Sequence, residues 1–128
     1  MAIICRNGVA REATCTEELK AMRDSIDVLG GKWKLRIMRY LANRTHEQNH
    51  FKKIQREIDG ISAKMLTKEL KELELNLLIS RTVLDTRPVS VAYAITSYGE
   101  SVLPLTDNLV QWGLNHREKI KGDPHVQG

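Results

Sequence analysis

The sequence predicts a mainly α fold with a β-hairpin wing near its carboxyl-terminal end. Apolar residues recur at three- and four-residue spacing in four separate stretches before residue 79, which is the period of amphipathic helices. Between residues 79 and 95 the period changes to two, which is typical of strands, and a further helical stretch follows. At 128 residues and 41% hydrophobic content, the chain can bury one respectable core, so we expect one domain.

The first two helices are defined by apolar stripes and by their end signals. Thr16 is expected to cap the first helix, with acids in the positive first turn, and Gly30–Gly31 ends it. Its apolar face is expected to contain Leu19, Met22, Ile26 and Leu29. The second helix follows at once, with a buried stripe of Trp33, Ile37, Met38 and Leu41.

A short third helix and a basic fourth helix are joined by a tight turn at Asp59–Gly60. The third helix is expected to bury Phe51, Ile54 and Ile58. The fourth lies within residues 61–78, begins at the N-cap residue Ser62, and lines its core side with Leu66, Leu70, Leu73 and Leu77. Its other face carries Ser62, Lys64, Thr67, Lys68 and Lys71. Two helices joined in this way, the second one basic, have the form of a helix-turn-helix.

The hairpin and the last helix complete the expected fold. Alternating positions in residues 79–83 and 89–95 predict two strands, and Arg87 lies in the turn between them. A hairpin directly after such a helix gives a winged helix-turn-helix. Residues 97–100 could form a capping box for the last helix, whose first turns Pro104 should kink. Its apolar residues Leu105, Leu109 and Trp112 are expected to form a homodimer interface.

Positive charge is concentrated in the centre of the chain. Residues 31–73 hold eleven Lys/Arg against five Asp/Glu, a net charge of +6, whereas the other 85 residues have a net charge of −2. This pattern resembles the electrostatic footprint of a nucleic-acid binder. Because aromatic side chains are few, double-stranded DNA is favoured over single-stranded RNA. We expect contacts from Ser62, Lys64, Thr67, Lys68, Lys71 and Arg87.

The ends of the chain set the expected boundaries. We expect an N-terminal arm over 1–14, the winged domain with its terminal dimerisation helix over 15–121, and a loose tail over 122–128. No apolar run is long enough for a signal peptide or a membrane span, so the protein is expected to be cytoplasmic. Its two cysteines match no zinc spacing, and we expect neither a metal nor another cofactor.

Several ordered motifs resemble the HxlR family of bacterial transcriptional regulators. They are residues 30–35 (GGKWKL), 60–67 (GISAKMLT), 91–96 (VAYAIT) and 112–113 (WG), and with Cys15 they cover residues 15 to about 117. The resemblance implies a winged helix-turn-helix, a homodimer closed by the terminal helices, and operator binding through the fourth helix and the wing.

Cys15 is the candidate redox-sensing residue. It lies at the start of the first helix, where the positive helix end favours a reactive thiolate, and Arg11 is near in sequence. Several HxlR-type regulators sense oxidants or electrophiles through a cysteine at this position, so the resemblance implies a switch. The alternative is a small apolar residue buried at a dimer contact.

Two other functions remain open. Residues 46–50 (HEQNH) fit the HExxH pattern of zinc-dependent hydrolases, which needs both imidazoles on one face of a helix. The flanking residues supply no apolar face for such a helix and no convincing third ligand, so we expect no catalytic residues and no enzymatic activity. The second alternative is a helix-turn-helix that serves mainly as a protein-interaction module.

Overall fold

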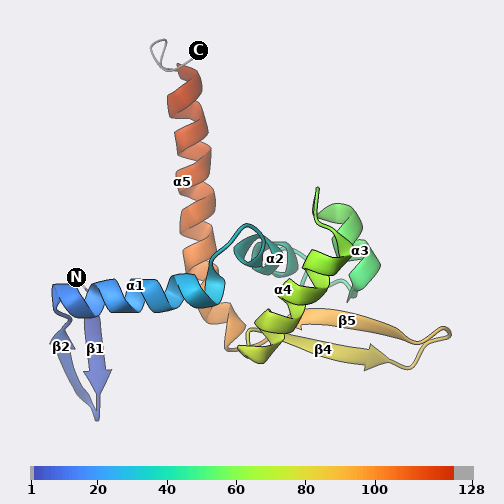
Figure 1. Ribbon diagram of the computed structural model, residues 1–128, viewed down its shortest axis with the longest axis horizontal. Coiled ribbons are helices and arrows are strands. Elements are labelled where there is room, and N and C mark those ends of the chain that lie inside the picture. The colour runs from blue at the N-terminus through green and yellow to red at the C-terminus, as the bar shows by residue number, and fades with distance from the viewer. Residues whose placement is uncertain (1, 123–128) are drawn as a thin grey trace. The chain divides into compact units, whose positions relative to one another are not determined.

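The computed structural model describes residues 2–122, and its compact units divide after Lys32. The first unit contains β1 (Ile3–Arg6), β2 (Val9–Glu12) and α1 (Cys15–Leu29) (Figure 1). The second contains all the other elements. The first helix, which we expected in one domain with the rest, is therefore in the N-terminal unit. The expected tail lies outside the described residues except for Gly122, the last residue of α5.

Residues 3–12 form an antiparallel hairpin where the sequence suggested only an arm. Ile3 pairs with Glu12 and Arg6 with Val9, and the turn residues Asn7 and Gly8 have φ angles of 52° and 77°. An Asn-Gly pair with both φ values positive is the preferred two-residue hairpin turn, because its twist matches that of the strands. The Asn7–Gly8 dipeptide was therefore the signal that could have predicted this hairpin.

The amino end of α1 is capped by Thr14, so the expected cap at Thr16 was wrong. The Thr14 hydroxyl accepts a hydrogen bond from the Glu17 amide at 3.2 Å, and the Glu17 carboxylate accepts one from the Thr14 amide at 2.9 Å. This is a complete capping box. Arg11 holds the same carboxylate at 2.7 Å and, with the Thr14 amide, lowers the pKa of Glu17 to about 2. Thr16 lies one residue inside the helix.

The expected apolar face of α1 is exposed within the described chain. Leu19, Met22 and Ile26 are 63%, 61% and 60% exposed, and α1 contains no buried residue. Burial of such a stripe is the usual source of helix stability in proteins, because isolated helices of this length are marginal in water. The stripe is present as the sequence predicted, and residues 2–122 leave it uncovered.

The second unit is a winged helix-turn-helix, as predicted. Its elements are α2 (Lys34–Ala42), β3 (Asn49–His50), α3 (Phe51–Glu57), α4 (Ala63–Leu75), β4 (Ile79–Leu84), β5 (Ser90–Ile95), the 3₁₀ turn η1 (Gly99–Val102) and α5 (Leu103–Gly122). The strands are antiparallel in the order β3-β5-β4. Figure 1 shows α2, α3 and α4 grouped at one end of the β4–β5 hairpin, whose tip extends beyond them.

The core of this unit joins α2, α3, α4 and the start of β4. Eight large side chains are almost completely buried there, and the apolar stripes expected on the second, third and fourth helices are confirmed apart from Leu77 and from Phe51, which is only half-buried. The eight side chains are Ile37, Met38, Leu41, Ile54, Leu66, Leu70, Leu73 and Ile79. In the described residues, no helix combines the length and apolar content needed to cross a membrane.

The larger exception is Leu77, which we expected in the core and which is 69% exposed. The α4 helix ends at Leu75 in a Schellman motif: the Leu78 amide bonds to the Leu73 carbonyl at 3.0 Å, and the Leu77 amide to the Glu74 carbonyl at 2.9 Å. The motif requires positive φ at Leu77, where it is 65°, and this turns the side chain out of the helical stripe. Leu78, 3% exposed, occupies the core instead.

A junction at Thr96 and Gly99 connects the end of β5 with η1 and α5. The Thr96 hydroxyl donates to the Leu77 carbonyl at 2.6 Å and accepts from the Gly99 amide at 2.9 Å. The capping box expected from Ser97 is therefore wrong, since Thr96 supplies the side-chain oxygen. Pro104 follows the change from 3₁₀ to α-helix and lies in the first turn of α5, where a missing amide is tolerated.

We expect Thr14→Ala to destabilise α1, because the substitution removes the acceptor for the Glu17 amide. Loss of an N-cap typically costs about 1 kcal/mol. The measurement is amide hydrogen exchange in the first turn of α1, which should become faster. Thr16→Ala is the matched control and should change exchange little. Equal effects of the two substitutions would contradict the assignment of the cap.

Candidate functional site

The turn between α3 and α4 sets where the candidate site begins. Gly60 has a φ of +85°, a conformation that side chains with a Cβ rarely adopt, so the chain can turn sharply into α4. Ser62 then caps α4, and its hydroxyl accepts from the Met65 amide at 3.1 Å. The expected role of Ser62 as N-cap is confirmed. The remaining amides of the first turn have no partner within the helix.

Four of the expected DNA-contacting side chains share one exposed face of α4. Lys64, Thr67, Lys68 and Lys71 follow each other at helical spacing and are all exposed. Within residues 2–122 none of the three lysines forms an ion pair. The Thr67 hydroxyl donates to the Ala63 carbonyl at 2.8 Å, so in this structure it bonds within its own helix.

Two acidic residues of α4 are neutralised from α2. The Lys34 ammonium lies 2.6 Å from the Glu69 carboxylate and 2.5 Å from that of Glu72. Lys34 is only 8% exposed and Glu69 only 7%. Burial disfavours the charged form of Lys34, but the hydrogen bonds to both carboxylates outweigh it and raise its pKa. The same ammonium lowers the pKa of Glu72. The sequence analysis did not identify this role of Lys34.

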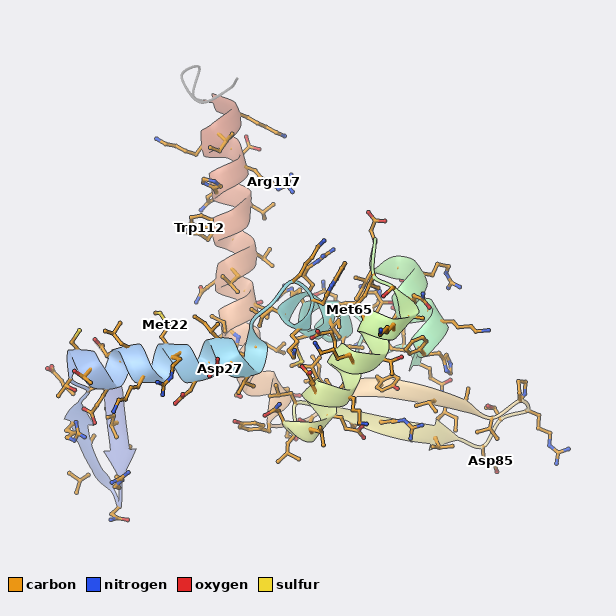
Figure 2. The ribbon with its side chains drawn as sticks, viewed as in Figure 1. Met22, Asp27, Met65, Asp85, Trp112 and Arg117 are labelled. Carbon is orange, nitrogen blue, oxygen red and sulfur yellow. The ribbon has the colours of Figure 1, made fainter. Side chains whose placement is uncertain are left out.

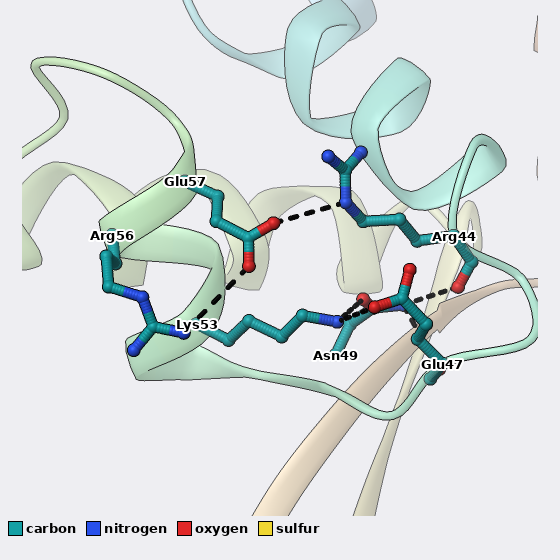
Figure 3. Close-up of polar contacts among 6 residues, drawn as sticks. All are labelled: Arg44, Glu47, Asn49, Lys53, Arg56 and Glu57. Carbon is teal, nitrogen blue, oxygen red and sulfur yellow. Dashed lines mark hydrogen bonds and ion pairs between the residues drawn. The ribbon is translucent and has the colours of Figure 1, made fainter.

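Acidic residues of the α2–β3 loop and of α3 are also paired with cations, as Figure 3 shows. Glu47 is bound by Lys53 at 2.6 Å, and Glu57 lies between Arg44 at 3.3 Å and Arg56 at 4.0 Å. Lys53 lowers the pKa of Glu47. Four of the five acidic residues in the basic block therefore lie against cations outside the exposed face of α4.

A cleft of about 420 Å³ lies beside α4. It is lined by Phe51, Thr67, Lys71, Glu74, Arg81 and Tyr93. Arg81 and Tyr93 are opposite each other on β4 and β5, so the cleft joins the lysine-bearing face to the sheet. Arg81 is exposed and was missed as a site residue. The sequence did carry a signal for it. Residues 79 and 81 lie on the same face of β4, so a charged arginine stands at a position where alternation predicts an apolar residue.

Arg87 lies at the tip of the β4–β5 hairpin, as expected, and is exposed. The tip is held by the Thr86 hydroxyl, which donates to the Pro88 carbonyl at 2.8 Å and lies 3.0 Å from the Ser90 hydroxyl. Arg87 is separate from the α4 residues along the sheet, because β4 runs the length of the wing between them.

The expected dimer residues lie along α5 and are largely uncovered. Leu105, Leu109 and Trp112 are 41%, 47% and 65% exposed. Trp112 projects from the helix in Figure 2 and stacks on His116 at 4.8 Å between ring centres. Nearer the start of α5, Arg39 of α2 forms an ion pair with Asp107, which fastens this end of the helix to α2.

Cys15 is the first residue of α1, and its side chain is exposed. It therefore lies inside the helix and follows the true cap Thr14, whereas the sequence suggested that it preceded the cap. Cys5 is exposed on β1, and neither cysteine is in a disulfide. In the described chain nothing buries Cys15, so any packing role would need a second molecule.

The HExxH residues do not form the helix that zinc chemistry would need. Residues 43–48 are turns and loop, and residues 49–50 form β3. His46 and His50 therefore do not share a helix face, and Glu47 is paired with Lys53. Among the residues that the structure describes, no three potential metal ligands are grouped to hold an ion.

Comparison with known proteins agrees with this fold. Residues 28–121 match the family model described as HxlR-like helix-turn-helix. The HTH-type transcriptional regulator YtcD of Bacillus subtilis is 37% identical over 99 residues, which are 77% of this chain and 76% of YtcD. The reduced redox regulator HypR superposes with a TM-score of 0.71 at 27% identity, covering 80% of this chain and 99% of HypR.

A second solved structure extends the comparison. The reduced transcriptional regulator YodB of B. subtilis has a TM-score of 0.62 at 34% identity, over 72% of this chain and 87% of YodB. The resemblance seen in the sequence motifs is thus confirmed by the family model and by whole-fold similarity. The chain belongs to the HxlR family of helix-turn-helix transcriptional regulators, which are not enzymes.

Proposed function

We propose that this regulator binds double-stranded DNA in a sequence-specific manner, with α4 in the major groove. One observation carries the proposal: Lys64, Lys68 and Lys71 form one exposed, unpaired face of α4. A helix in the major groove needs such donors toward phosphates and base edges. The capped start at Ser62 also directs free amides outward, where a phosphate can accept from them. The protein would act in the cytoplasm, where its operator is.

Arg81 and Arg87 extend the proposed interface from α4 along the wing. Arg81 shares a cleft with Lys71, so the two cations can face the same stretch of DNA backbone. Arg87 at the hairpin tip is placed to reach a phosphate or the minor groove. The competing function, a protein-interaction module, requires no such row of unpaired cations. It predicts no steep dependence of binding on salt.

We expect Lys64→Ala and Lys68→Ala each to weaken binding to a duplex from the region upstream of the protein's own gene. Removing one phosphate contact should also lower the slope of log affinity against log salt by about 1. Fluorescence anisotropy over a salt series measures both quantities. Lys119→Ala, at an exposed position near the end of α5, is the control. Unchanged affinity in both α4 variants would refute the placement of α4.

We further propose that the protein is a homodimer closed by its terminal helices. The support is apolar surface that the described chain leaves uncovered: Leu105, Leu109 and Trp112 on α5, and the stripe of Leu19, Met22 and Ile26 on α1. Exposed apolar stripes of this kind usually mark an interface. A symmetric dimer would cover the same patch on both chains and present two α4 helices to a palindromic site.

The dimer predicts the oligomeric state of two variants. At micromolar concentration the wild-type protein should scatter light as a dimer. Leu109→Glu should shift it toward a monomer, because a charge would enter an apolar contact without a partner. Arg117→Glu changes charge at an exposed position of the same helix and serves as the control. A monomeric wild-type protein would contradict the interface and the expectation of a palindromic operator.

Cys15 is proposed to make DNA binding responsive to oxidants or electrophiles. It is exposed at the amino end of α1, where an oxidant or electrophile can reach it, and the similar protein HypR is described as a redox regulator. Modification there would add bulk beside the exposed stripe of α1. The alternative, a cysteine packed at the dimer contact, predicts no change in DNA affinity on oxidation.

We expect oxidation to change operator affinity by a factor of about 5–150, the usual range for coupling between two sites. The change should disappear in Cys15→Ser. Cys5→Ser is the control and should respond like the wild type unless Cys5 acts as the resolving partner. Affinity measured before and after treatment with diamide, with reduction by dithiothreitol as the return step, provides the test. Equal affinity of oxidised and reduced wild-type protein would return Cys15 to a packing role.

A further inference from the structure

We infer that Lys34 is a positioning residue that fixes the rotational setting of α4 on the core. This inference rests on the proposed binding of DNA through α4. Lys34 is the first residue of α2 and makes no contribution to the exposed cationic face, since it is 8% exposed. Its ammonium instead joins two carboxylates three residues apart on α4. The ion-paired group of Lys34, Glu69 and Glu72 is called the clamp below.

The geometry of the clamp restricts rotation of α4 about its own axis. A single ammonium is held between carboxylates that lie one helical turn apart, at 2.6 Å and 2.5 Å. Rotation of α4 about its axis would lengthen one contact or both. Glu69 is 7% exposed and Lys34 8%, so neither charge has ready access to water as a substitute partner, whereas the Glu72 side chain is 39% exposed. A rotated helix would therefore leave a buried charge unpaired, which is strongly destabilising.

The apolar contacts of α4 do not provide the same selectivity. Leu66, Leu70 and Leu73 supply most of the free energy that attaches the helix to the core, but apolar side chains of suitable size tolerate repacking. A buried ion pair shows the opposite balance. The desolvation of its charges offsets much of their attraction, so it adds little stability and strongly favours one geometry. The clamp thus selects a setting that the leucines alone would leave loose.

The clamp and the charge alone predict opposite changes in affinity for the preferred DNA sequence. Replacing all three residues with neutral ones of similar size removes two negative charges and one positive charge close to the proposed DNA face. If charge alone mattered, DNA of any sequence would be bound as tightly or more tightly, because the face would become more positive. If the clamp fixes the setting of α4, binding to the preferred sequence should weaken in spite of that gain.

The test uses the full-length triple variant Lys34→Met, Glu69→Gln, Glu72→Gln. Lys34→Met alone would leave the buried Glu69 carboxylate without its cationic partner. Circular dichroism first establishes that the variant is folded. Its affinity is then measured for the upstream duplex and for a scrambled duplex. We expect the ratio of these affinities to fall by at least about tenfold, which corresponds to about 1.4 kcal/mol. Affinity for the scrambled duplex should be unchanged or higher.

Glu118→Gln, at an exposed position near the end of α5, is the control, because it makes the same net change of +1 in the charge of the protein without touching the clamp or the proposed DNA face. It should keep the ratio of the wild-type protein. A triple variant that keeps the wild-type ratio would overturn the inference and leave Lys34 a role in stability only. A fall in the ratio with Glu118→Gln as large as in the triple variant would also overturn it, since the change in net charge would then suffice.

A second measurement does not depend on DNA. Spin labels on exposed positions 36 and 68, one on α2 and one on α4, report the distance between the helices in a variant lacking both natural cysteines. The distance distribution should be narrow with the clamp and broader in the triple variant. If no duplex is bound, the proposed function fails, and this measurement still decides the inference. An equally narrow distribution in the triple variant would refute it.

Discussion

The apolar cluster shared by α2, α3, α4 and the start of β4 orients every other part of the winged unit. Complete burial of one Leu or Ile side chain contributes about 1.5–3 kcal/mol, and eight large side chains are buried here. Because Leu66, Leu70 and Leu73 must face this cluster, the opposite side of the helix, with Lys64, Thr67, Lys68 and Lys71, faces outward. The cationic face of α4 is therefore a consequence of where the core requires leucine. The wing is attached to the same cluster through Ile79.

The acidic side chains of the basic block are mostly paired with cations, whereas the lysines of α4 are exposed. The net charge of the chain does not reveal this distribution. The basic block contains five acidic residues, but Lys34, Arg44 and Lys53 bind four of them on the inner side of α4 and around α3. Short-range pairing of this kind removes most of their field at a distance, since opposite charges a few ångströms apart cancel. The exposed lysines of α4 therefore dominate the potential on their side of the molecule more than a count of residues indicates.

Sequence periodicity predicted the helices, the hairpin wing and the exposed lysines, because these depend on patterns within one element. The errors arose where a partner distant in sequence, or a local turn, decided the outcome. Leu77 fits the leucine spacing, but a Schellman turn exchanges it with Leu78. Thr16 is a residue type that often caps helices, but the cap is Thr14. Its hydroxyl accepts from the Glu17 amide, and Arg11 binds the Glu17 carboxylate. The partners of Lys34 lie more than thirty residues away, and no spacing within α2 indicates them.

The junction at Thr96 makes the last turn of α4 and the first turn of η1 neighbours that cannot move independently. One hydroxyl is bonded to both the Leu77 carbonyl and the Gly99 amide. A Cβ on residue 99 would lie 2.0 Å from the Leu78 carbonyl oxygen, so the two segments touch backbone to backbone. No flexible side chain lies between the two segments to absorb a displacement. A tilt of α5 would therefore shift the carboxyl end of α4 as well. The position of the long helix α5 is thereby coupled to the end of α4.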